Sequence, residues 1–313
     1  DDDSKRNQEK RKRGELTFKE RLLKLQDKRM AIIFDECHRS QFGDNHEAIK
    51  TFFPKAQLFG FTGTPIFEEN SNYKQVDGTI GSYKTTKDVF EKELHSYTIT
   101  NAIDDGNVLR FHIDYFKPDD TQIAAKADTK VNKKKIVEAI LSKHDAATYS
   151  RRYNAIFATA SINEAIEYYG LFNDVQKEYL DTNESFVPLN ISCVFSPPAE
   201  GNKDVKQLQE DLVQEKEDNK QEPDKKKEAL RRIIDDYNSK YKTNHTINDF
   251  DLYYLDAQQR IKDQQYPNAD YPHENKIDIV IVVDMLLTGF DSKYLNTFPE
   301  SKYLPKQAVL EGA

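Results

Sequence analysis

Two adjacent carboxylates, Asp35 and Glu36, directly follow an apolar run that begins at Met30. Such a run is typical of a strand buried on both faces of a parallel sheet, and open α/β sheets bind ligands at the carboxyl ends of such strands. At that position Asp35 can hold Mg²⁺, usually through water, and Glu36 can polarise a water that attacks a nucleoside triphosphate. The alternative for this pair alone is a strand that ends in a solvated acidic turn.

A second candidate loop contains Thr62, Gly63 and Thr64 and follows a strand predicted at 56–61. Gly63 permits the close approach of another backbone, and Pro65 fixes the direction in which the chain leaves. The two hydroxyls can hydrogen-bond neighbouring acids and so respond to the state of a bound nucleotide. Turns of this composition are common, so the loop alone is weak evidence for a function. It becomes informative because the acid pair precedes it in the sequence.

A third loop contains Thr288, Gly289 and Asp291 and follows the most apolar strand of the chain, predicted at 277–283. Its alternative is an ordinary strand-exit turn. Because two loops of the same kind occur upstream, we predict a functional role for it. The backbone of Thr288 and Gly289 is expected to meet a nucleic-acid strand, while Asp291 points toward the nucleotide or the loop at 62–64.

The apolar patterning predicts strands and helices that alternate in two blocks, which is typical of an α/β fold with parallel sheets. The strands are predicted at residues 30–35, 56–61, 108–116, 154–159, 189–195 and 277–283. The helices are predicted at 44–53, with Asp44 or Asn45 as its cap, and at 86–104, 131–144 and 162–180. The polar stretch at 117–130 predicts a linker between a first domain at 1–116 and a second at 131–313. Narrow apolar stripes within the charged stretch 200–265 predict a packed helical insertion in the second domain.

The composition limits the classes of partner and compartment. The 313 residues carry a formal net charge of −8, so contact with nucleic acid must come from local basic patches. One such patch is residues 1–29, which either contact a DNA backbone or form a solvated helix. Cys37 and Cys193 lie in apolar segments, which favours a reducing, cytoplasmic compartment without disulfides. The sequence shows no membrane-spanning apolar run and no signal peptide, so we expect no membrane partner.

Several stretches together resemble the R (motor and restriction) subunit of type I restriction-modification enzymes, which is a superfamily 2 helicase-like family. They are residues 35–43, 59–65 and 283–291, together with 101–109 and 154–161. The resemblance spans about residues 15–298. It implies two RecA-like lobes that use ATP and Mg²⁺ to translocate duplex DNA in bacteria or archaea. It also implies methyltransferase and specificity subunits as partners and a separate nuclease domain.

The resemblance also implies a role for each matching residue. Asp35 is the Mg²⁺ residue, and Glu36 activates water. The implied nucleotide-binding residues are His38, Thr62, Gly63, Thr64, Gly289 and Asp291. Of these, His38, Thr62 and Thr64 couple the nucleotide state to domain closure. Arg39 and Thr288 are the implied DNA contacts.

Two parts of such a motor are missing from the sequence. None of the eleven glycines is followed by Lys-Ser or Lys-Thr, so no Gly-x4-Gly-Lys-[Ser/Thr] phosphate loop is present. The residues after 298 do not match the arginine-bearing motif VI of the family, and the chain begins Asp-Asp-Asp rather than with Met. We therefore expect a piece of a longer protein, with an incomplete first lobe, that alone neither hydrolyses ATP nor translocates.

Two other functions compete with this interpretation. A general superfamily 2 helicase acting on RNA or forked DNA is disfavoured by residues 39–43 and by the helical insertion. A non-catalytic module that binds DNA or docks partner subunits fits the missing motifs, and it need not respond to ATP. Nucleotide affinity therefore discriminates the module from the motor.

Overall fold

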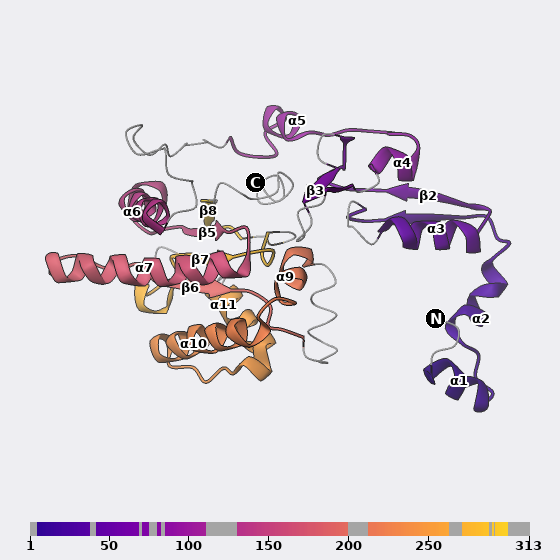
Figure 1. The fold of residues 1–313 in the computed structure, drawn as a ribbon. Helices are drawn as coiled ribbons and strands as arrows, with labels where there is room; N and C mark the ends of the chain where they lie inside the picture. The colour runs from indigo at the N-terminus through magenta and orange to yellow at the C-terminus, as the bar shows by residue number, and fades with distance from the viewer. Residues whose placement is uncertain are drawn as a thin grey trace. The chain divides into compact units, whose positions relative to one another are not determined.

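The computed structural model describes residues 5–37, 42–68, 71–74, 80–82, 85–110, 130–199, 212–262, 271–287, 290 and 292–299. The chain forms two compact units, Asp1–Arg110 and Phe111–Ala313 (Figure 1). Both are α/β assemblies with parallel strands, as the sequence predicts. The predicted domain boundaries at 116 and 131 stay a prediction, because residues 117–129 lie outside the described residues.

The first unit is built around a strand–helix–strand unit. Its elements up to that point are α1 (Lys5–Lys12), α2 (Phe18–Leu22) with a 3₁₀ turn (Leu23–Leu25), β1 (Met30–Phe34), α3 (Phe42–Phe52) and β2 (Ala56–Gly60). A reciprocal pair of hydrogen bonds between Thr17 and Glu20 caps the start of α2. β1 and β2 pair in parallel, with Met30 opposite Ala56 and Phe34 opposite Gly60. The predicted βαβ unit is therefore confirmed, although α3 begins before the expected caps Asp44 and Asn45.

The prediction that the first strand is buried on both faces is wrong. Residues along β1 alternate between half-buried and exposed, and Ile33 is 66% exposed. The reason is that β1 and β2 form a two-stranded sheet, in which one face of β1 is left uncovered among the described residues. Alternation of this kind is typical of a strand that is covered on one side.

The remainder of the first unit departs from the prediction in two places. It contains an antiparallel pair, β3 (Asn72–Lys74) and β4 (Ile80–Ser82), and two short helices, α4 (Thr86–Phe90) and α5 (Ile99–Asp104). The helix predicted at 86–104 is wrong, because Glu91 has φ 65° and ends α4, while Thr98 caps a new helix. Of the strand predicted at 108–116, residues 108–110 form no strand and the others lie outside the described residues.

The second unit is built on a four-stranded parallel sheet in the order β6-β7-β5-β8. The strands are β5 (Asn154–Ala158), β6 (Ile191–Val194), β7 (Ile279–Val282) and β8 (Leu295–Thr297). Every residue of β5, β6 and β7 is buried. The strands predicted at residues 154–159, 189–195 and 277–283 are therefore confirmed, and here the apolar runs do belong to strands buried on both faces.

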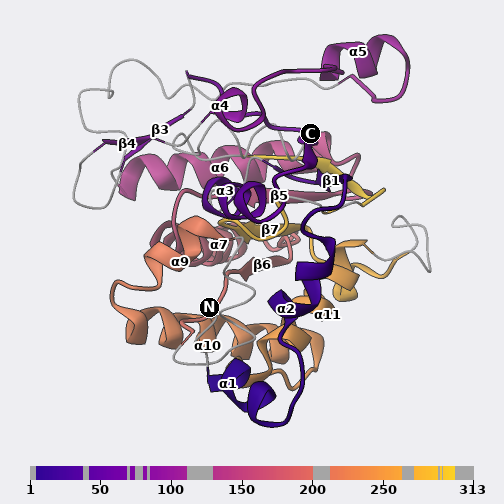
Figure 2. The same cartoon turned by 90° about the vertical axis from the view of Figure 1, so that its right-hand side faces the viewer.

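Helices surround this sheet (Figures 1 and 2). They are α6 (Lys130–Ala147), α7 (Ile162–Thr182), α9 (Val213–Asp218), α10 (Pro223–Tyr241) and α11 (Phe250–Lys262). In Figure 1 the strands follow one another from top to bottom in the order β8, β5, β7 and β6, and α10 with α11 lies below β6. None of the described helices combines the length and apolar composition that a membrane span would need.

The helical insertion belongs to the core of the second unit. The apolar stripes predicted in it are buried in α10 and α11. Tyr253 of α11 is fully buried, and its hydroxyl donates a hydrogen bond of 2.8 Å to the carbonyl oxygen of Cys193 in β6. The insertion therefore does not fold apart from the sheet.

Replacing Tyr253 by phenylalanine should lower the free energy of unfolding of the second unit by about 1–2 kcal/mol, because the buried carbonyl of Cys193 loses its tyrosine donor. Urea unfolding of the chain measures this loss. Tyr149→Phe is the matched control, because Tyr149 is 71% exposed. Equal stability of the two variants would contradict the prediction.

Candidate functional site

In the first unit, the acid pair follows β1 and the threonine loop follows β2, and the two segments run side by side. Beyond the last paired residues of β1 and β2, the amide of Phe61 donates to the carbonyl oxygen of Phe34 at 2.8 Å. The amide of Cys37 then donates to the carbonyl oxygen of Phe61 at 3.0 Å. Residues 35–36 are therefore held beside the chain that enters Thr62.

The acid pair has an unusual backbone. Asp35 is exposed and Glu36 is half-buried. Glu36 has φ 49°, and its amide donates to Asp35 Oδ1 at 3.0 Å. A left-handed backbone at a residue other than glycine costs on the order of 1–3 kcal/mol and is concentrated at functional sites. The strained turn keeps both carboxylates at the carboxyl end of β1.

The loop after β2 is ordered by its own hydroxyl groups. The Thr62 Oγ1 atom accepts a hydrogen bond from the amide of Thr64 at 3.0 Å, which closes a tight turn around Gly63. Thr64 is buried, with 3% of its surface exposed. The loop is tied to α4, because the amide of Ile66 donates to Thr86 Oγ1 at 2.8 Å and the amide of Thr86 donates to the Ile66 carbonyl at 2.9 Å.

A packed layer beneath the two loops fixes their separation. A Cβ atom on Gly60 would lie 2.5 Å from Phe90 Cζ and 2.7 Å from Cys37 Sγ, so only glycine fits there. The Phe90 ring packs against His46 and Phe34, with centroids 5.3 and 6.3 Å apart. Burial, together with the charges of the two preceding acids, raises the pKa of the Cys37 thiol to about 11, so the thiol is neutral and structural. Sequence reasoning missed this role of Gly60 and Phe90.

The residues at the end of β1 fit a magnesium ion that is bound mainly by other ligands. Mg²⁺ in nucleotide enzymes is held by one or two carboxylates together with waters and substrate phosphates. Asp35 is an exposed carboxylate of that kind. No group of three or more His, Cys, Asp or Glu side chains that could hold a metal by itself occurs in the part of the chain that the structure describes.

In the second unit, a hydrogen-bonded contact joins the carboxyl ends of the neighbouring strands β5 and β7. The amide and the Oγ1 atom of Thr159 both donate to the carbonyl oxygen of Val282, at 2.9 and 2.8 Å. After β7, Met285 and Leu287 are buried, and Leu286 adopts φ 64°. The third candidate loop thus starts from a rigid, strained segment.

Some predicted site residues cannot be placed. Asp35, Glu36, Thr62, Gly63 and Thr64 are described, and the structure brings their two segments together. The residues that lie outside the described ones are His38, Arg39, Thr288, Gly289 and Asp291. Their implied roles stay predictions.

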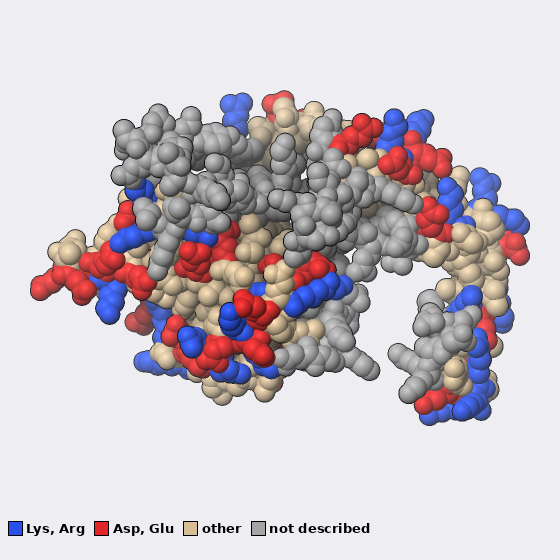
Figure 3. Space-filling model, in the orientation of Figure 1, with Lys and Arg blue, Asp and Glu red and all other residues tan. Residues whose placement is uncertain are grey.

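Basic side chains gather along the N-terminal helices (Figure 3). The last turn of α1 carries Lys10, Arg11 and Lys12, and Arg11 pairs with Glu20 at 3.1 Å. A basic helix can contact phosphates or simply face water.

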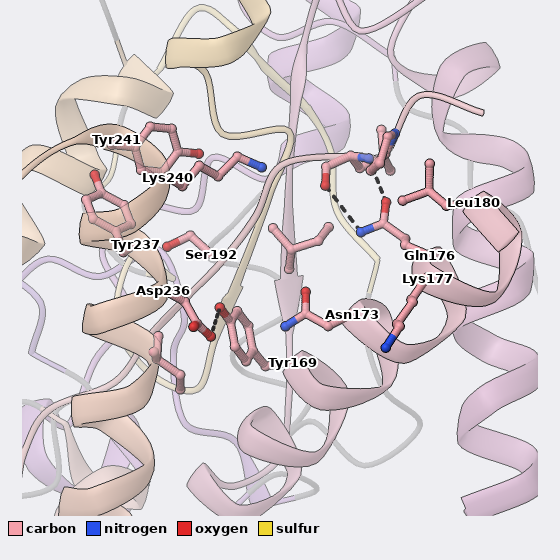
Figure 4. Close-up of a pocket in the computed structure, with 14 residues that line it drawn as sticks. Tyr169, Asn173, Gln176, Lys177, Leu180, Ser192, Asp236, Tyr237, Lys240 and Tyr241 are labelled. Carbon is pink, nitrogen blue, oxygen red and sulfur yellow. Dashed lines mark hydrogen bonds between the residues drawn. The ribbon is translucent and has the colours of Figure 1, made fainter. Parts of the chain in front are cut away.

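A polar cavity of about 410 Å³ lies between α7, α10 and β6 (Figure 4). The amide of Leu189 donates to Gln176 Oε1 at 2.6 Å, while Gln176 Nε2 donates to the Leu189 carbonyl at 3.2 Å. The Tyr169 hydroxyl donates to Asp236 Oδ2 at 3.1 Å. Leu189 precedes β6, so this end of the cavity is opposite the carboxyl ends of the strands. These polar groups satisfy one another, which does not favour the cavity as the nucleotide site.

Comparison with known proteins gives two matching family models. Residues 5–149 match the SWI2/SNF2 ATPase family, and residues 151–311, more than half of the chain, match domain 3 of the type I restriction enzyme subunit R. The parallel sheets with flanking helices agree with a helicase-like RecA fold.

Curated relatives agree with these models. The endonuclease subunit of the type I restriction enzyme SauCOLORF180P of Staphylococcus aureus strain COL is 36% identical over 291 residues, which are 88% of this chain and 27% of the relative. The corresponding subunit of SsaAORF53P of Staphylococcus saprophyticus is 35% identical over 300 residues, which are 90% of this chain and 28% of the relative. The chain thus spans about a quarter of the length of these relatives. By its sequence, its family models and its fold, the chain belongs to the type I restriction enzyme R subunit family.

Proposed function

We propose that this chain is part of the ATP-dependent motor of a type I restriction endonuclease, which translocates duplex DNA before cleavage. The observation that carries the proposal is the joined exit of β1 and β2, where Asp35 and Glu36 lie beside the segment that leads into Thr62. Carboxylates and hydroxyls at adjacent strand ends are what a nucleotide site of this fold class needs.

Each residue then has one role. Asp35 organises Mg²⁺ bound to the phosphates of ATP, and Glu36 orients and activates the attacking water. Thr62 and Thr64, together with His38, couple the state of the nucleotide to closure of the two units. The metal supplies charge neutralisation of the phosphates, while the chain supplies position.

The partners follow from the same assignment. Duplex DNA is the polymer along which the motor moves, and Arg39 and Thr288 are among its contacts. Gly289 and Asp291 respond to the bound nucleotide. Methyltransferase and specificity subunits anchor the motor at its target, so the DNA recognition sequence is set by another chain. The bacterial relatives are named as endonuclease subunits, which supports this placement.

We expect this 313-residue chain alone to hydrolyse no ATP. It has no phosphate loop, and contacts of the arginine-finger kind are worth on the order of 10³–10⁵ in rate. The test is ATP hydrolysis with and without linear duplex DNA. It compares this chain with a version extended at both ends to include a phosphate loop and motif VI, which we call the extended protein.

The outcomes separate the candidates. DNA-stimulated hydrolysis in the extended protein alone would support the motor. Hydrolysis by the 313-residue chain would refute its predicted inactivity. No hydrolysis in either would favour the non-catalytic module for DNA binding or subunit docking, which the missing phosphate loop also fits.

A further inference from the structure

The short helix α9 of the insertion contacts the segments that follow β5, β6 and β7. At its N-terminal end, Asp284 Oδ2 accepts hydrogen bonds from the amides of Gln214 at 2.8 Å and Glu215 at 3.1 Å. At its C-terminal end, Asp218 Oδ2 accepts a hydrogen bond of 2.7 Å from the amide of Ile162, in the first turn of α7. One helix therefore reaches the exits of strands that are far apart in the sequence.

Glu215 makes the reciprocal contacts. Its Oε1 atom accepts from the amides of Asp284 and Met285 at 3.0 and 3.2 Å, and its Oε2 atom accepts from the amide of Ser196 at 2.5 Å. The Asp284 carboxylate thus caps the N-terminal end of α9. In return, the Glu215 carboxylate of α9 accepts from the first amides of the segment that begins at Asp284. This arrangement resembles a capping box made between two distant segments.

Neighbouring residues hold α9 in place. Asn219 Nδ2 donates to the carbonyl oxygen of Ser196 at 2.9 Å. Lys226 of α10 is 2% exposed, and its ammonium group donates to the carbonyl oxygens of Asp218 and Gln221. The positive charge of Lys226 at the C-terminal end of α9 interacts favourably with the carbonyl dipoles of that helix.

The Glu215 carboxylate is fully buried and is held by amides. Burial and the negative charge of Asp284 raise its pKa to about 7. Tyr254 and Cys193 also interact electrostatically with Glu215 in the described part of the second unit. A buried carboxylate with several amide donors fixes geometry more strictly than an apolar contact does.

We propose that α9 is a latch, with Glu215 and Asp284 as its positioning residues, that holds residues 284–287 in register with the ends of β5 and β6. These residues lead in the sequence directly into Thr288. The functional part of the inference rests on the proposed motor, because it states that DNA-coupled ATP turnover requires the latch to be closed.

Hydrogen exchange of the 313-residue chain tests the latch without any activity. In Glu215→Gln, exchange of the amides of Ser196 or of residues 284–285 should accelerate on the order of tenfold, because glutamine offers one acceptor oxygen in place of two and its NH2 group then faces the amides on the other side. The β5 peptide, 154–158, should keep its rate. Glu217→Gln is the matched control in the same helix, since Glu217 lies at the surface and pairs with Lys220.

The extended protein tests the functional part. Glu215→Gln should lower the DNA-stimulated kcat and leave the KM for ATP within about twofold, because the nucleotide residues of the first unit are untouched. Asp284→Asn serves if Glu215→Gln does not fold, and it should accelerate exchange at residues 214–215.

Failure of the latch and failure of the motor are distinguishable. Equal exchange at both Ser196 and 284–285 in Glu215→Gln and Glu217→Gln, or equal acceleration in the β5 peptide, would overturn the latch. An unaltered extended protein without DNA-stimulated ATPase would instead overturn the motor. A responsive latch together with unchanged DNA stimulation would refute the coupling between them.

Discussion

Replacing Glu36 by glutamine in the extended protein should lower ATP hydrolysis by about 10²–10⁴-fold, while ATP and DNA still bind. Glutamine has nearly the shape of glutamate but cannot polarise the attacking water. The turn should survive, because its hydrogen bond to Asp35 Oδ1 comes from the main-chain amide of residue 36. Single-turnover hydrolysis and the affinity for a fluorescent ATP analogue measure the two effects separately.

The control for this variant is Glu93→Gln, which makes the same chemical change at an exposed position of the first unit. It should hydrolyse ATP at the unaltered rate. A Glu36→Gln protein that still translocates duplex DNA would show that another residue activates the water, and the assignment of Glu36 would be abandoned.

Replacing Gly60 by alanine should destabilise the first unit by about 1–3 kcal/mol through overpacking. The new methyl group would lie within 3 Å of both Phe90 and Cys37. Phe90 cannot simply turn away, because its ring is packed against those of His46 and Phe34. Cys37 follows the acid pair directly, so the strain should also disturb Glu36. Urea unfolding, followed by exchange of residues 30–37, measures both consequences.

Gly63→Ala is the matched stability control for Gly60→Ala. A Cβ atom on Gly63 meets no atom within 4 Å, so alanine should leave the free energy of unfolding nearly unchanged. If the two alanine variants unfold at the same urea concentration, the packed layer beneath the loops does not set the position of the acid pair.

Sequence patterns predicted the second unit better than the first, for a physical reason. The strands β5, β6 and β7 are buried on both faces, so their apolar runs are unambiguous. The long helices α7 and α10 each bury one apolar face, which gives a clear helical period. In the first unit β1 is partly exposed, and its apolar sequence overstates its burial.

Short elements escaped prediction because their sequences carry little periodic signal. The strands β3, β4 and β8 have three residues each. The break at Glu91 was also missed, although Thr98 with Asn101 three residues later is a cap signal that could have revealed the second helix.

The candidate site was predictable only in part. Asp35 and Thr62 were singled out because each follows an apolar strand, and the pairing of β1 with β2 places those two strand ends together. Glu215 could not be found in this way, since it lies in a charged insertion and its partner Asp284 is distant in the sequence. Only tertiary structure distinguishes its carboxylate from the many solvated acids around it.

The position of β7 inside its sheet has a consequence for synthesis of the chain. β7 lies between β5 and β6, yet it is made long after both of them. A ribosome-bound chain that ends before Ile279 already contains the apolar strands β5 and β6. It still lacks β7, the strand that pairs with both of them. Non-local pairing of this kind is slow and leaves strand edges open to other chains. The helices α10 and α11 are made in this interval, so they can cover the side of β6 that Tyr253 contacts before the partner strand β7 emerges.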